Sequence, residues 1–380
     1  MTPAAAPPVL HLDRVLDDPT TRVIVCCGSG GVGKTTTAAA LGLRAAEHGR
    51  NVVVLTIDPA RRLAQSMGLT ELDNTPRRVK GVDGAAGGEL HAMMLDMKRT
   101  FDDVVLAHAS PERAQAILDN PFYQSLSSSF AGTQEYMAME KLSQLRAQER
   151  WDLIVVDTPP SRSALDFLDA PKRLGSFLDG RFIRVLMGGA RTGGRAYLKV
   201  LGAGFGVVTG ALTKILGAQV LKDAQTFVAA LDTMFGGFRE RADTTYQLLQ
   251  AAGTAFVVVA APERDALREA SYFVERLGEE DMPLAGLVLN RVHVTAAPEL
   301  SAERALAGAE TLEEQGDHQL TAGLLRLHAD RMRLINREQH LRGSFTAAHP
   351  RVPVADVPAQ PGDVHDLAGL RVIGTALAAS

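Results

Sequence analysis

Short runs of apolar residues recur along this chain, and most of them are nearly continuous, without polar residues at alternate positions. A strand reads this way when helices cover both faces of its sheet. The runs occupy residues 22–27, 51–58, 90–96, 151–157, 254–261, 284–290 and 351–357. Segments with helical spacing lie between them, such as 35–48, 132–148 and 263–277. This alternation predicts an α/β fold with a mostly parallel sheet and helices on both faces.

One region breaks the alternation of strands and helices. Residues 161–253 contain helical patterns but no convincing buried strand. Their longest glycine-rich apolar stretch is uncharged only from Val200 to Thr213, which is shorter than the roughly 20 residues that a bilayer requires. We therefore expect a helical insertion and no integral membrane segment. The predicted organisation is a tail at 1–20, a sheet core at 21–160 and 254–380, the insertion at 161–253 and charged surface helices at 299–345.

Composition narrows the class of protein. The chain has 380 residues, of which 46% are hydrophobic and 22% charged, and its net charge is −4. This balance is typical of a globular enzyme and gives no sign of a nucleic-acid partner. Cys26 and Cys27 are the only cysteines, and adjacent residues on a strand point to opposite faces, so a bond between them is not expected. With no leader-like start, these features predict a reducing, cytoplasmic location.

A phosphate-binding loop is the clearest motif. The stretch "GSGGVGKT" at 28–35 fits G-x-x-x-x-G-K-[ST], between an apolar strand and a helix. Its glycines allow backbone N–H groups to surround phosphate oxygens, and the helix start adds positive charge. Lys34 is expected to reach the β- and γ-phosphates of ATP, and Thr35 to ligate Mg²⁺. The alternative is a glycine-rich turn without a ligand. The predicted contacts are Gly28, Ser29, Gly30, Gly31, Val32, Gly33, Lys34, Thr35 and Thr36.

Two aspartates end apolar strands. Asp157 follows "WDLIVV" and Asp58 follows "NVVVLTI". Ligands of open α/β sheets bind at the carboxyl ends of strands, so both side chains are expected near the nucleotide. We assign Asp157 to the Mg²⁺ shell and Asp58 to orienting or deprotonating the attacking water. The alternative for each is a helix cap.

In this order, these motifs resemble the family of arsenite-pump ATPases and tail-anchored-protein targeting ATPases. The resemblance rests on "GSGGVGKTT", "DPARRL", "DTPPSRSALDFL", "APERDALREASYFVERL" and "GLVLNRV". It implies a dimeric P-loop ATPase that uses ATP and Mg²⁺. It also implies that Asp58 and Asp157 are the two switch aspartates and that Asn290 reads adenine. The stretch from Pro358 to Asp363 resembles the loop that closes over the base.

Several departures from the family pattern affect the expected activity. The family loop typically reads GKGGVGKT, and Ser29 stands where its first lysine would be. In related dimers, that lysine reaches the partner's phosphates. The second switch has Arg162, Ser163 and Asp166 in place of glycine, histidine and arginine. The metalloid-binding and zinc-binding cysteines of relatives are absent as well, so we do not expect metalloid transport.

The resulting hypothesis is an ATPase that couples its nucleotide state to a protein partner or a hydrophobic client. Low intrinsic activity is expected, with Arg162 or a paralogous subunit supplying the missing positive charge. A homodimer and a mixed dimer both remain open, as does a regulatory subunit that hydrolyses ATP poorly. A partitioning or Min-like localisation switch is the weaker alternative. Client binding would use the insertion, whose residues for testing are Met187, Phe205, Met234, Phe235 and Phe238. The alternative, which an apolar and glycine-rich helical region more often indicates, is core packing or a dimer face.

Overall fold

The computed structural model describes residues 8–58, 62–121, 123–124, 134–159, 240, 243–316 and 318–379. The chain divides into two compact units. Unit 1 comprises Met1–Met94, Glu149–Ala164 and Leu249–Ser380, and unit 2 comprises Leu95–Gln148 and Leu165–Leu248. Residues 95–148, which the sequence analysis placed in the sheet core, therefore group with unit 2. Most of the expected insertion at 161–253 lies outside the described residues, as do its five residues for testing.

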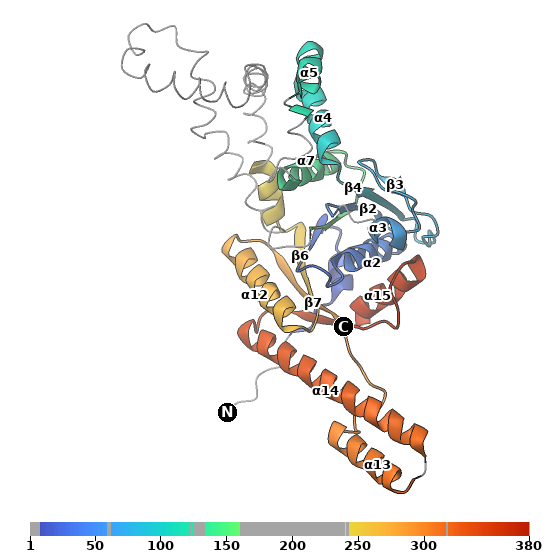
Figure 1. Ribbon diagram of the computed structural model, residues 1–380. Helices are drawn as coiled ribbons and strands as arrows, with labels where there is room; N and C mark the ends of the chain where they lie inside the picture. The colour runs from blue at the N-terminus through green and yellow to red at the C-terminus, as the bar shows by residue number, and fades with distance from the viewer. Residues whose placement is uncertain are drawn as a thin grey trace, which may run out of the picture. The chain divides into compact units, whose positions relative to one another are not determined.

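Unit 1 is built on an eight-stranded sheet with the spatial order β3-β4-β2-β5-β1-β6-β7-β8 (Figure 1). Neighbouring strands are parallel except β3 and β4. The strands are β1 Val23–Cys27, β2 Asn51–Thr56, β3 Arg77–Arg78, β4 Glu89–Met94, β5 Leu153–Asp157, β6 Thr254–Ala260, β7 Leu284–Val292 and β8 Val354–Pro358. All seven apolar runs form strands, which confirms the mostly parallel α/β fold. Only β3 was not predicted, because two residues carry no periodicity.

Helices cover the sheet and explain why its strands lack alternation. Figure 1 shows α2 and α15 on one side of the sheet and α12 on the other. Ile24 and Cys26 of β1 belong to the core that α2 and α15 share, while all five β1 residues are buried. Both faces of β1 are thus apolar. The helices of unit 1 are α1 Leu12–Asp17, α2 Lys34–Glu47, α3 Arg62–Ser66, α12 Arg264–Glu279, α13 Ala302–Glu314, α14 Gln319–Ala348 and α15 Leu367–Ala379.

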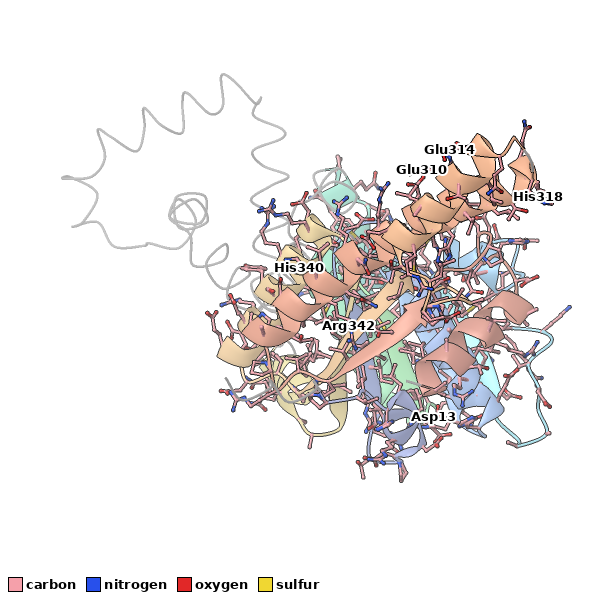
Figure 2. The ribbon with its side chains drawn as sticks, turned by 90° about the horizontal axis from the view of Figure 1, so that it is seen from below. Asp13, Glu310, Glu314, His318, His340 and Arg342 are labelled. Carbon is pink, nitrogen blue, oxygen red and sulfur yellow. The ribbon has the colours of Figure 1, made fainter. Side chains whose placement is uncertain are left out.

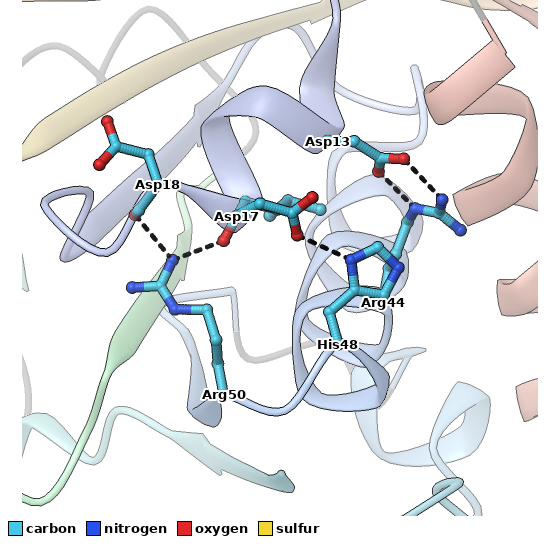
Figure 3. Close-up of polar contacts among 7 residues, drawn as sticks. Asp13, Asp17, Asp18, Arg44, His48 and Arg50 are labelled. Carbon is cyan, nitrogen blue, oxygen red and sulfur yellow. Dashed lines mark hydrogen bonds and ion pairs between the residues drawn. The ribbon is translucent and has the colours of Figure 1, made fainter. Parts of the chain in front are cut away.

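The short helix α1 is tied to the end of α2 by a set of polar contacts (Figure 3). Arg44 donates two hydrogen bonds to Asp13, at 2.5 and 2.7 Å, and His48 Nδ1 lies 2.8 Å from Asp17. The hydrogen bond from Arg44 lowers the pKa of Asp13. Arg50 donates a hydrogen bond to the backbone oxygen of Leu16 at 2.7 Å. These contacts fix the end of α2 opposite to the one that begins at the phosphate loop.

The charged segment near the C-terminus forms a helical hairpin of α13 and α14. The Ser301 side chain caps α13 by accepting a hydrogen bond from the Arg304 backbone at 3.3 Å. The two helices pack through a small cluster of buried side chains, namely Ala302, Ala305, Ala329, Met332 and Ile335. Figure 2 labels Glu310 and Glu314 on α13, where both are exposed. The hairpin thus has one buried apolar seam, and its exterior carries charged side chains together with exposed leucines of α14, namely Leu320, Leu324, Leu327 and Leu334.

The described part of unit 2 is helical. Its helices include α4 Met97–His108, α5 Pro111–Leu118 and α7 Gln134–Ala147, and residues 243–248 are helical as well. Asp96 caps α4 by accepting from the Arg99 backbone at 2.9 Å, and Tyr123 donates a hydrogen bond to Asp102. Lys141 of α7 lies 3.8 Å from Asp103 of α4. Across the described parts of the chain, no helix combines the length and the apolar character that crossing a bilayer requires.

Candidate nucleotide site

The loop after β1 turns sharply at glycines that no other residue could replace without strain. Gly28 has φ +148° and Gly33, which precedes α2, has φ +97°. A Cβ added at Gly28 would lie 2.1 Å from the Val259 carbonyl oxygen, and one at Gly33 would lie 2.2 Å from Asn290 Nδ2. Glycine is therefore required both for conformation and for space. The turn directs the first N–H groups of α2 towards the carboxyl end of the sheet.

Lys34, the first residue of α2, is held against its own loop. Its side chain is 5% exposed, and its Nζ donates a hydrogen bond to the backbone oxygen of Ser29 at 2.7 Å. Burial lowers the pKa of Lys34, and the negative charge of Asp157 opposes that shift. The ammonium group thus rests on one backbone carbonyl, a contact that phosphate oxygens can replace with charge-assisted hydrogen bonds.

A buried carboxylate lies next to the start of α2. Asp157 Oδ2 accepts hydrogen bonds from Thr35 Oγ1 at 2.8 Å and from Thr56 Oγ1 at 2.9 Å. Asp157 is 0% exposed, and its second oxygen, Oδ1, is buried without a hydrogen-bond partner. Burial raises the pKa of Asp157 to about 6, although both threonines lower it. An unpartnered buried carboxylate oxygen beside a threonine hydroxyl suits the hydrated shell of a cation such as Mg²⁺.

Asp58 lies at the end of the neighbouring strand. Thr56 of β2 pairs in register with Asp157 of β5, and the Ile57 backbone donates to the Asp157 carbonyl oxygen at 2.9 Å. The Asp58 backbone donates to Thr56 Oγ1 at 3.2 Å. Adjacent parallel strands therefore bring the two aspartates to one edge of the sheet, as predicted for ligand sites of this fold.

One cavity of about 990 Å³ extends along this edge. At one end lie Asp58 and α3, which follow β2, and at the other lie Asn290 of β7 and Pro358 of β8. Asn290 is 8% exposed, and its amide donates to the Val32 backbone oxygen at 2.8 Å. The lining comprises Gly31, Gly33, Lys34, Thr35, Thr36, Asp58, Arg62, Gln65, Ser66, Asn290, Arg291, His293, residues 358–365 and Ile373. Its size fits a nucleotide.

A second, smaller cavity lies on the other face of the phosphate loop. Its volume is about 290 Å³. Ser29 lines this cavity and is not among the residues that line the larger one. The walls include three acidic side chains, those of Glu263, Asp265 and Glu269. Position 29 therefore shares a cavity with acidic residues of its own chain.

The structure brings most of the predicted site residues to one place. Lys34, Thr35, Asp157, Asn290 and Pro358 gather with Asp58 around the larger cavity or at its base. Ser29, Gly30 and Val32 line the smaller cavity and not the larger one, and Arg162 lies outside the described residues.

Sequence reasoning assigned no role to Thr56, Arg62 or Arg291. The available signal was their position. Thr56 stands two residues before a strand-end aspartate, Arg62 belongs to the motif "DPARRL", and Arg291 follows the strand-end asparagine. Polar residues near the carboxyl end of a parallel strand are candidates for ligand contact on topology alone.

Comparisons with known proteins identify a family for this chain. The sequence model of the anion-transporting ATPase family matches residues 21–308. The chain is 31% identical over 170 residues to "ATPase GET3" of Malassezia globosa, which covers 45% of this chain and 48% of that protein. It is 26% identical over 287 residues to "ATPase get3" of Pyrenophora tritici-repentis, covering 74% and 76%. For "ATPase get3" of Aspergillus terreus, identity is 28% over 285 residues, covering 74% and 76%.

Proposed function

The chain belongs to the anion-transporting ATPase family and is an ATPase, and from this premise we propose that it binds Mg-ATP in the 990 Å³ cavity and couples hydrolysis to a protein partner. One observation carries the assignment of the site. The hydrogen-bonded pair of Thr35 and Asp157, with its unpartnered Oδ1, lies at the base of the phosphate loop, whose cavity extends to Asn290 and Pro358.

The proposed reaction is the attack of water on the γ-phosphorus of ATP. A bond forms between the water oxygen and phosphorus, while the bond from phosphorus to the β–γ bridging oxygen breaks and leaves its electron pair on ADP. Asp58 orients the water and takes its proton. Lys34 leaves the Ser29 carbonyl for the β- and γ-phosphate oxygens. Thr35 and Asp157 would hold Mg²⁺, which neutralises phosphate charge when bound.

The chain connects the proposed hydrolytic site directly to unit 2. The strand that ends in Asp157 leads into the second segment of unit 2, which begins at Leu165. A change around Asp157 when the γ-phosphate leaves would therefore pass along the backbone to that unit. This link supports a cycle in which nucleotide state controls binding of a protein partner, in a homodimer or in a mixed dimer with a paralogous ATPase. The proposed partner includes the possibility named above, a hydrophobic client protein.

Calorimetry and turnover on one variant test the nucleotide site. Lys34→Ala removes the cation next to the β- and γ-phosphates, so we expect Mg-ATP affinity to fall on the order of 100-fold. Lys80→Ala, at an exposed lysine outside the cavity, is the matched control and should bind like the wild type. Equal affinity in Lys34→Ala and the wild type would refute the site. A wild type that binds ATP but turns over only with a paralogous ATPase would favour the regulatory-subunit alternative.

A further inference from the structure

Phosphoryl transfer requires positive charge around the γ-phosphate, and Ser29 supplies none. The cavity wall contains four basic side chains besides Lys34, namely Arg62, Arg291, His293 and His365. Both histidines have partners, since His293 Nδ1 lies 2.6 Å from Glu338 Oε1 and His365 Nδ1 lies 2.8 Å from the Asp363 backbone oxygen. The two arginines are therefore the cations to compare.

The two arginines lie at opposite ends of the cavity. Strand order places β5 and β2 on one side of β1, and β6, β7 and β8 on the other. Arg62 follows Asp58 after β2, whereas Arg291 follows Asn290 on β7. The water-orienting carboxylate and the base-contacting amide mark these as the γ-phosphate end and the adenine end. Arg62 is thus the arginine at the end where the reaction takes place.

The backbone beside Arg62 is anchored, while its side chain is exposed. Helix α3 packs against α2, and the next two residues, Leu63 and Ala64, are buried in the core. Ser66 Oγ donates to the Leu63 carbonyl oxygen at 3.1 Å and closes the turn. Within the described parts of the chain, no hydrogen bond or ion pair occupies the Arg62 guanidinium. A fixed backbone with an uncommitted cationic side chain at a phosphate site is the arrangement that preorganised charge stabilisation requires.

We propose that Arg62 contacts the γ-phosphate oxygens from within the same chain and supplies the positive charge that Ser29 does not. The proposal rests on the ATP site proposed above. A guanidinium keeps its charge at all physiological pH values and offers paired N–H groups that match two phosphate oxygens. Because negative charge spreads over the γ-oxygens in the transition state, this contact strengthens as the reaction proceeds. Arg62 is then a catalytic residue of this ATPase.

Two substitutions at Arg62 test the proposal. We expect Arg62→Ala to lower the single-turnover rate on the order of 10²- to 10³-fold. Arg62→Lys, which keeps the charge but loses the paired geometry, should recover part of that loss. Affinity for a non-hydrolysable ATP analogue should fall more than affinity for ADP, because ADP lacks the γ-phosphate. Arg78→Ala, at an exposed arginine outside the cavity, is the matched control and should keep wild-type turnover.

The outcomes separate the role of Arg62 from the existence of the site. If wild-type protein binds neither ATP nor ADP, the proposed nucleotide site itself fails. If the wild type binds and hydrolyses ATP and Arg62→Ala turns over within twofold of it, the site stands and the role of Arg62 is refuted. Equal loss of ATP-analogue and ADP affinity would also refute a γ-phosphate contact. Arg61→Ala and Arg162→Ala, measured in parallel, would identify a different arginine if only one of them loses turnover.

Discussion

The two faces of the phosphate loop differ in chemistry although they share the same backbone. One face lines the large cavity, whose walls include Lys34, Asp58 and Asn290. Asp58 follows β2 and Asn290 lies on β7, which is four positions away in the strand order. The other face lines the 290 Å³ cavity, whose walls include Ser29 and three acidic residues, Glu263, Asp265 and Glu269. On the first face, positive charge is needed to stabilise the phosphates. On the second face, the carboxylates would bind a positively charged side chain. The role of a loop residue therefore depends more on which cavity the residue lines than on the motif to which it belongs.

Position 29 shows how backbone and side chain can serve different faces. The Ser29 carbonyl oxygen accepts the hydrogen bond from Lys34 Nζ at 2.7 Å, on the nucleotide side. Ser29 lines the small cavity and is not among the residues that line the large one. A substitution at position 29 therefore keeps the carbonyl that holds Lys34 and changes only the carboxylate-lined face.

The largest effect on the nucleotide face is expected at Asp58. We expect Asp58→Asn to bind Mg-ATP with little change and to lower the single-turnover rate on the order of 10²- to 10⁴-fold, because an amide cannot take up the proton of water. Rapid-quench measurement of ADP formation checks this. Asp83→Asn, at an exposed aspartate outside the cavity, should keep the wild-type rate. A rate in Asp58→Asn equal to that of this control would leave Asp58 as a structural cap.

The next effect concerns the turn that separates the faces. Gly33→Ala would place a Cβ 2.2 Å from Asn290 Nδ2 at a φ of +97°. The strain of a left-handed residue and the clash together predict a loss of roughly 2–4 kcal/mol in the free energy of unfolding. Gly31→Ala is the matched control, because its φ is also positive, at +77°, but no atom lies within 4 Å of its added Cβ. Chemical denaturation should show the smaller loss in Gly31→Ala; equal losses would mean that the Asn290 contact is not restrictive.

Asn290 lies at the adenine end, where a smaller effect is expected. Its amide donates one N–H to the Val32 carbonyl oxygen at 2.8 Å, so the second N–H and the amide oxygen are the groups that can read the base. Asn290→Ala should reduce the preference for ATP over GTP by about tenfold, the value of one lost specific hydrogen bond. Competition binding measures this ratio. An unchanged ratio, with both affinities reduced equally, would assign Asn290 to holding the loop alone.

Much of the fold was readable from the sequence, because burial on both faces leaves a continuous apolar signal. Each of the seven runs became a strand, and the helices at 35–48 and 263–277 appear as α2 and α12. The gathering of Lys34, Thr35 and Asp157 also follows from topology, since strand ends of a parallel sheet converge. Sequence could not show which way a loop side chain points. The face of Ser29 and the exposure of Arg62 depend on dihedral angles and tertiary packing, which leave no periodic trace.

The smallest effect is expected where the family pattern is restored, and it is the sharpest test of the two-face comparison. Ser29→Lys would place an ammonium group in the cavity lined by Glu263, Asp265 and Glu269. Opposite charges at short range hold the lysine there, with a contribution of about 0.2–1 kcal/mol for such a partly exposed pair. Turnover of the pure protein should therefore stay within about twofold of the wild type, while the midpoint of thermal unfolding shifts slightly upward.

A combined variant tests whether the carboxylates hold this lysine. Ser29→Lys together with Glu263→Gln, Asp265→Asn and Glu269→Gln removes the carboxylates and releases the lysine, and the same triple variant with Ser29 intact is the control. If Ser29→Lys alone raises turnover tenfold or more, the cation at position 29 reaches phosphates despite its own carboxylates. That result would place the missing charge across a subunit interface, and the division of the loop into a catalytic face and an acidic face would have to be abandoned.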